Sequence, residues 1–176
     1  LGITFVHVTH SQEEAMALAD IIVVMNDGRI EQAAPPRVVF EQPATAFVAR
    51  FMGDHNVISG RVTTSNMMET ILSVPSGGSF WAPSSGTPEG DPADIAIRTD
   101  RVKIGEAAET GLGFTGTISN IEYRGSSVKL VATGAGIEEF TAILSDTMFF
   151  ATPVKVGEAI QLSWAPEDVI VLGRPH

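Results

Sequence analysis

The sequence predicts a mixed fold, in which a short α/β segment is followed by an all-β domain. Two observations lead to this prediction. Residues 1–52 alternate between apolar β-branched runs and helical patterns, whereas short runs of alternating apolar residues recur after residue 53 between Gly, Pro and Ser. The change falls at Gly53-Asp54-His55, so we expect one unit over residues 1–55 and a second over residues 56–176.

The first segment contains clear start and turn signals. Ile3–Val8 is apolar on both faces, as in a strand buried between two helix layers. Ser11 and Glu14 have the spacing of a capping box, which starts a helix. Asp27-Gly28 favours a tight hairpin turn because both residues tolerate positive φ. The remaining elements expected here are strands at 21–25 and 29–33 and helices at 37–41 and 44–52.

The second segment is typical of a β-sandwich or a small barrel. Residues 75–92 hold four Pro and four Gly, which predicts a long loop or a ragged hairpin. A weak internal repeat aligns residues 97, 100, 102 and 104 with 164, 167, 169 and 171, and Gly60-Arg61-Val62 with Gly116-Thr117-Ile118. Strands are expected at 57–63, 70–74, 95–98, 115–123, 127–132, 139–144, 159–164 and 169–172.

Composition limits the classes of function. The net charge is −10, and residues 53–176 hold eight Lys/Arg against fifteen Asp/Glu, so a nucleic-acid partner is disfavoured. Without cysteine there is no disulfide and no thiolate metal site. The chain opens at Leu1-Gly2, directly before an apolar run, and we therefore expect residue 1 to lie inside a larger protein.

The strongest candidate site residue is His10. It follows the predicted strand at Ile3–Val8 and directly precedes the helix that Ser11 caps. Ligands of open α/β sheets bind at this edge, and a helix N-terminus favours phosphate. An imidazole can hydrogen-bond an attacking water or a terminal phosphate. A histidine that merely caps or packs at a strand end fits the local pattern equally well.

The stretch Thr4–Gln32 resembles the switch-histidine region of ABC-transporter ATP-binding subunits. The resemblance implies that His10 is the switch-loop histidine, which senses the γ-phosphate of ATP. The matching positions are Val8-Thr9-His10, Gln12-Glu13-Glu14-Ala15, Ala19-Asp20, Ile22, Val24-Met25, Gly28, Ile30 and Gln32. The positions that fit the importer branch of this family are Pro36, Phe40, Pro43, Phe47-Val48-Ala49, Phe51, Gly53 and Asn56.

The β-segment is similar to the OB-like accessory domain, called TOBE, of maltose-, polyamine- and iron-type importer subunits. Thr99-Asp100 departs from that pattern, where Pro-Glu is frequent, as does Tyr123-Arg124-Gly125, where a Leu often precedes the Gly. The residues that carry the similarity are Gly60-Arg61-Val62, Ala96-Ile97-Arg98 with Asp100 and Val102, Ile121–Gly125 and Trp164–Val169.

Together these resemblances imply the C-terminal part of the ATP-hydrolysing subunit of a bacterial importer, which energises uptake of a small solute, polyamine or iron rather than sugar. They imply ATP and Mg²⁺ as cofactors of the complete protein. They further imply a homodimer, transmembrane permease subunits, an indirectly engaged periplasmic solute-binding protein, and a peripheral place on the cytoplasmic face of the inner membrane.

The nucleotide-binding motifs of that family are not in this sequence. It has no Gly-Lys dipeptide and hence no P-loop, no L-S-G-G-Q-type signature, and no four-residue apolar run ending in Asp-Glu. We therefore expect the complete protein to be an ATPase, but this chain alone to hold no cofactor or metal and to hydrolyse no ATP.

The alternative function is a stand-alone β-module that senses a small ligand such as an oxyanion and has a regulatory role. Gly111, Gly113 and Gly116 match a dinucleotide-binding pattern, but the strand predicted after them argues against it. We interpret His7, His55 and His176 as structural or solvated, Trp81 and Trp164 as core residues, and Phe149-Phe150 as part of either the core or a contact between subunits.

Overall fold

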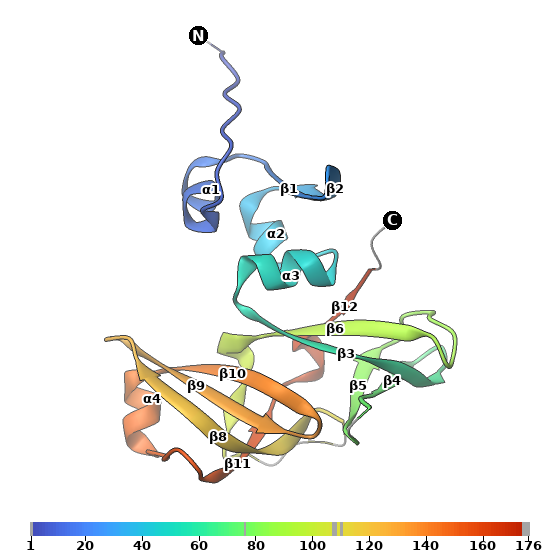
Figure 1. Ribbon diagram of the computed structural model, residues 1–176, viewed down its shortest axis with the longest axis vertical. Helices are drawn as coiled ribbons and strands as arrows, with labels where there is room; N and C mark the ends of the chain where they lie inside the picture. Colours follow the sequence, from blue (N-terminus) through green and yellow to red (C-terminus); the bar gives the residue numbers. More distant parts are fainter. Residues whose placement is uncertain (1, 76, 107–108, 110, 174–176) are drawn as a thin grey trace.

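The computed structural model describes residues 2–75, 77–106, 109 and 111–173 (Figure 1). The N-terminal part contains α1 (Gln12–Leu18), β1 (Ile22–Asn26), β2 (Arg29–Ala34), α2 (Pro36–Glu41) and α3 (Ala46–Met52). β1 and β2 pair through the predicted turn, in which Asp27 and Gly28 have φ values of 46° and 77°. The small apolar cluster that holds these elements together is Ile22, Val24, Val39, Val48 and Met52.

The strand predicted at Ile3–Val8 does not form. These residues have no regular structure, with Ile3 65% and Val8 91% exposed, and Figure 1 shows the segment running away from the rest of the molecule. A strand that is apolar on both faces depends on paired neighbours and on covering layers. None of the described strands pairs with it. The expected α/β layer is thus reduced to one antiparallel hairpin and three helices.

The β-segment forms two five-stranded antiparallel sheets in the described residues, so its predicted all-β class is confirmed. One sheet has the order β12-β6-β3-β4-β5 and the other β10-β9-β8-β11-β7. The strands are β3 (His55–Ser65), β4 (Glu69–Ser73), β5 (Ser79–Pro83), β6 (Pro92–Arg98), β7 (Lys103–Ile104), β8 (Gly113–Tyr123), β9 (Ser127–Gly134), β10 (Ile137–Ser145), β11 (Ala159–Ser163) and β12 (Val169–Leu172).

Three short helices complete this segment: η1 (Thr99–Arg101), α4 (Asp146–Ala151) and η2 (Pro166–Asp168). All the strands predicted for the β-segment are present, with boundaries that differ by a few residues. The prediction missed β5, β7 and α4. β5 lies in the Pro/Gly-rich stretch, where a ragged hairpin was one of the two expectations, and β7 has only two residues.

The internal repeat seen in the sequence is a structural repeat. β3-β4-β5-β6-η1-β7 is followed by β8-β9-β10-β11-η2-β12, and the last strand of each half joins the sheet of the other half. The register of β3 shifts after Val62 and that of β8 after Ile118. The carbonyls of Val62 and Ile118 each accept a 2.8 Å hydrogen bond, from the N–H of Gly90 and Gly157. Because β7 and β12 are exchanged, neither half completes its own sheet.

The core of the β-segment lies between the two sheets and is mainly aliphatic, with a group of aromatic rings that includes Trp164, Phe140 and Phe114. Trp164 is 4% exposed, which confirms its predicted place in the core. Its ring lies 5.2 Å from that of Phe140, which in turn meets Phe114 edge-to-face at 5.2 Å. Such pairs contribute about 0.5–1.5 kcal/mol each beyond the burial of area. Trp81 only borders this core and is partly exposed.

Helix α3 joins the two parts of the molecule, because both of its sides are covered. Figure 1 shows α3 between α2 and the sheet that contains β6 and β3. Val48 and Met52 belong to the N-terminal cluster, whereas Ala49 packs on Ala96 and Leu172 of the sheet. Gly173, which follows β12, also lies in this region, where its N–H donates to the carbonyl of Ala44 at 2.8 Å. None of the helices in the described part of the chain is long and apolar enough to span a bilayer.

Candidate functional site

His10 lies in the turn that precedes α1, and its side chain is exposed. The predicted N-cap is confirmed, since Ser11 Oγ accepts a hydrogen bond from the Glu14 N–H at 3.2 Å. The second half of the expected capping box is not formed. Instead, Thr9 Oγ1 donates to the Glu14 carboxylate at 2.6 Å and accepts from the Ser11 N–H at 3.0 Å. The turn is therefore closed by Thr9, and it presents His10 to solvent.

The carboxylate of Glu14 is the electrostatic centre of this turn. The hydrogen bond from Thr9 holds its pKa below the ordinary value, and His7 and the nearby His10 act in the same direction. Nε2 of His7 lies 3.4 Å from Glu14 Oε2, while the His7 side chain remains 62% exposed, as expected for a solvated histidine. No local pattern indicates this pair, because an irregular segment separates the two residues.

In the part of the chain that the structure describes, His10 is not part of a metal-ligating cluster. In the described residues, no group of three or more His, Cys, Asp or Glu is placed to hold a metal ion such as Mg²⁺. Two shallow cavities lie elsewhere. One is lined by Ala46, Phe47, Arg50, Phe51 and Asp94, and the other by Asn66, Met67, Met68, Glu69 and Trp81. His10 lines neither cavity.

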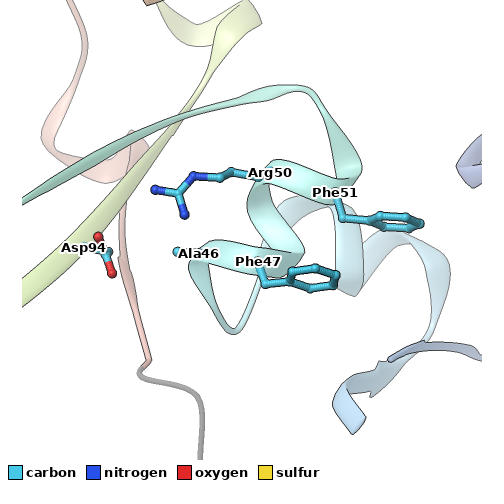
Figure 2. A pocket seen from close by; sticks show the side chains of 5 residues that line it. All are labelled: Ala46, Phe47, Arg50, Phe51 and Asp94. Carbon is cyan, nitrogen blue, oxygen red and sulfur yellow. The ribbon is translucent and has the colours of Figure 1, made fainter. Parts of the chain in front are cut away.

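The cavity beside α3 was not expected from the sequence. Figure 2 shows Arg50 reaching toward Asp94, while the rings of Phe47 and Phe51 lie together along the helix. A guanidinium nitrogen of Arg50 donates to Ser59 Oγ at 3.3 Å, and the Ser59 hydroxyl donates to the Asp94 carboxylate. These polar contacts tie α3 to β3 and β6. Only the i,i+4 spacing of the two Phe residues was visible in the sequence.

A second set of contacts joins α2 to β3 and β6. The guanidinium carbon of Arg98 lies 5.1 Å from the centre of the Phe40 ring, and a side-chain nitrogen lies 3.9 Å from Glu41. His55 packs edge-to-face on Phe40 at 5.9 Å. It is 8% exposed, and neither ring nitrogen has a hydrogen-bond partner. Burial, and secondarily Arg98, lowers the pKa of His55 to about 4.

The structure also tests the interpretations of the other histidines, of Phe149-Phe150 and of the glycine pattern. The structural role of His55 is confirmed, whereas His176 lies outside the described residues. Phe149 is buried in the core, while Phe150 is 64% exposed, and both rings pack against Tyr123. The stretch after Gly111 is strand β8, as expected, so the glycine pattern there lacks the helix that a dinucleotide site requires.

The outer face of the β1-β2 hairpin is an exposed apolar surface. Met25 and Ile30 are directly paired across the two strands and are 57% and 63% exposed. Val23, 48% exposed, is paired with Ala33 on the same face. The opposite face of the hairpin, with Ile22 and Val24, is buried against the helices. A sheet with apolar residues on both faces normally has a covering layer on each.

Substitution of this outer face is expected to change surface behaviour but not folding. Met25→Lys with Ile30→Lys should lower the fluorescence of a bound hydrophobic dye by at least about half, because apolar patches of this kind are what such dyes bind. The melting temperature should change by less than about 4 °C, since both side chains are already exposed. Met67→Lys, at an exposed turn far along the chain, is the control. Unchanged dye binding in the double variant would contradict the assignment.

Comparison with known proteins agrees with this architecture. Residues 95–172 match the TOBE domain family. The chain is 33% identical over 180 residues to the spermidine/putrescine import ATP-binding protein of Nitratidesulfovibrio vulgaris, a match that covers 98% of this chain and 48% of the relative. It is 40% identical over 129 residues to the Fe(3+) ions import ATP-binding protein of Brucella abortus, covering 73% of this chain and 35% of the relative.

A solved structure supports the fold alone. A cytoplasmic molybdate-binding protein superimposes with a TM-score of 0.58 at 17% identity, covering 66% of this chain and 94% of that one. Residues 95–172, which run from within β6 to the end of β12, are thus the part of the β-segment that matches the TOBE domain family. The chain as a whole is similar to the ATP-binding proteins of importers, as its resemblance around His10 implied. It spans about half the length of the curated relatives it matches.

Proposed function

We propose that this chain is the C-terminal part of the ATP-hydrolysing subunit of a bacterial importer and that His10 senses the nucleotide. The observation that carries the proposal is the exposed imidazole on a turn closed by Thr9, Ser11 and Glu14. Similarity to importer subunits over 98% of the chain supports it. A stand-alone ligand-sensing β-module is not favoured, because that similarity includes the residues before the β-segment.

The chain's own residues have a limited role in this chemistry. ATP and Mg²⁺ would supply the γ-phosphate and its charge neutralisation, and both would be held by a part of the protein with the P-loop that this sequence lacks. Thr9 and Glu14 fix the backbone on either side of His10. The imidazole then needs little rearrangement to hydrogen-bond a phosphate oxygen or a water presented to it, which is how preorganised polar groups act in catalysis.

The exposed face of the hairpin supports the presence of such a part. Val23, Met25 and Ile30 offer an apolar surface, and the relatives are about twice as long as this chain. We further propose a second copy and transmembrane permease subunits as direct partners, a solute-binding protein as an indirect one, and a peripheral place on the cytoplasmic face of the inner membrane. The names of the relatives favour a polyamine or iron as the solute.

Replacing His10 in the complete subunit tests the proposal. His10→Ala should slow ATP hydrolysis at least about tenfold, because one positioned proton-handling group is lost. The dissociation constant for ATP should change less than about twofold, since the phosphate cradle lies elsewhere. Steady-state hydrolysis and equilibrium binding measure the two quantities. Glu13→Ala, on the exposed face of α1, is the matched control. Near-normal hydrolysis in His10→Ala would remove His10 from the mechanism.

A further inference from the structure

The C-terminal end of α3 is closed by the side chain of Gln12. The last carbonyls of a helix have no partner within it. The Gln12 amide nitrogen, in the orientation that satisfies its neighbours, donates to the carbonyl of Phe51 and to that of Met52 at 3.2 Å. A primary amide has two N–H donors, and it here meets two acceptors. Gln12 therefore supplies a cap for α3 from a distant position in the chain.

Gln12 comes two residues after His10 and is the first residue of α1. α1 packs on the N-terminal apolar cluster through Ala15 and Met16, and Ala19, which follows the helix, does the same. The same cluster includes Val48 and Met52 of α3. The amide of Gln12 is thus the polar contact that ties the start of α1, and with it the His10 turn, to the end of α3.

The end of α3 leads almost directly into the β-domain. Gly53 follows with a left-handed φ of 78°, and β3 begins at His55. The carbonyl of Asp54 accepts a hydrogen bond from the Thr99 N–H at 2.9 Å, and this bond holds the connection against η1. β3 is the middle strand of its sheet. A movement of the end of α3 therefore reaches β3 through a connection of two residues.

We propose that Gln12 is a positioning residue that couples the His10 turn to the orientation of the β-domain. A shift of the turn moves the Gln12 amide, and the amide carries the end of α3 and the Gly53 connection with it. The part of this inference that concerns nucleotide rests on the proposed function of His10. The mechanical part concerns this chain alone, so the two can be tested separately.

The mechanical part is tested by amide hydrogen exchange on this chain. Gln12→Glu has nearly the same shape but brings a negative charge to the carbonyl end of a helix and removes both donors. It should accelerate exchange at residues 50–53 about fivefold to tenfold, the loss expected for one to two hydrogen bonds. Gln12→Lys should stay within about twofold of the unmodified chain, because an ammonium group also donates to such carbonyls.

Glu13→Gln, on the exposed side of the same helix, is the matched control and should leave these amides unchanged. A mere loss of stability would accelerate exchange throughout α3 in every variant that perturbs α1. The proposal requires that amide exchange at residues 50–53 is faster in Gln12→Glu than in Gln12→Lys. Equal protection in the Glu and Lys variants overturns it.

The coupling itself is tested in the complete subunit with spin labels at Leu18→Cys and Met67→Cys, which are both exposed and lie on opposite sides of the Gly53 connection. The distance between the labels should change when Mg-ATP is added. Gln12→Glu should reduce that change at least about twofold, and Gln12→Lys should restore it. A full response in Gln12→Glu, or no response in the unmodified subunit, overturns the inference. Failure of the proposed function is seen separately, as near-normal hydrolysis in His10→Ala.

Discussion

Replacing Asn56 by alanine is expected to lower the free energy of unfolding by about 2–3 kcal/mol. Asn56 is 7% exposed and lies on β3. Its Nδ2 donates to the carbonyl of Thr141 at 2.8 Å, and its Oδ1 accepts from the Thr141 N–H at 2.7 Å. β10, which contains Thr141, is an edge strand of the other sheet. The Asn56 amide thus acts as a substitute strand partner, and its loss leaves two backbone groups without one.

Urea denaturation of the purified chain measures this effect. Asn56→Asp keeps the acceptor but loses the donor, and it also buries a charge. It should therefore lower the free energy of unfolding at least as much as Asn56→Ala does. Asn120→Ala is the matched control, because Asn120 is exposed on β8 and should change stability by less than about 0.5 kcal/mol. A stability loss in Asn56→Ala no larger than that of the control would show that this link does not hold the sheets together.

The elements predicted correctly are those that depend on local signals. Asp27-Gly28 specifies its turn through backbone conformation alone, and Ser11 specifies a helix start through one short-range bond. The strands of the β-segment show the apolar alternation that a half-buried strand requires, as the burial of β9 and β10 illustrates. The same reasoning found the repeat.

The elements that were missed depend on distant residues. Ile3–Val8 has the composition of a central strand, but a strand exists only with its neighbours, and composition cannot supply them. The bond between Asn56 and Thr141 spans 85 residues and leaves no trace in either local pattern. At the site, His10 and the Ser11 cap were predicted. The Glu14 carboxylate was expected to accept a hydrogen bond from the Ser11 N–H. It accepts one from the Thr9 hydroxyl instead, because that hydroxyl competes for the same carboxylate.

The burial of His55 also depends on a distant residue, since it is Phe40 of α2 that packs on the imidazole. This burial predicts sensitivity to acid. An imidazole of ordinary pKa 6.5 that falls to about 4 in the folded state binds its proton more readily when unfolded. The contribution of the neutral His55 to the free energy of unfolding is therefore fully present above pH 6.5 and is lost as the pH falls toward 4. By pH 4 the loss should reach about 3 kcal/mol, from the free energy equivalent of the lowered pKa.

His55→Leu should remove this part of the pH dependence. Two unpaired buried nitrogens are replaced by carbon, so at pH 7.5 the variant should be about as stable as the unmodified chain. Burial raises the pKa of the Asp54 carboxyl, so Asp54 makes stability change with pH in the opposite direction. Asp54 is present in both His55→Leu and the unmodified chain, so its effect cancels when the two are compared. The difference between their stability curves, measured by urea denaturation from pH 7.5 to 4, thus isolates His55. His10→Gln, at an exposed site, should follow the unmodified chain. Parallel curves for His55→Leu and the unmodified chain would mean that His55 binds its proton equally well in the folded and unfolded states, so that packing against Phe40 does not exclude water from the imidazole.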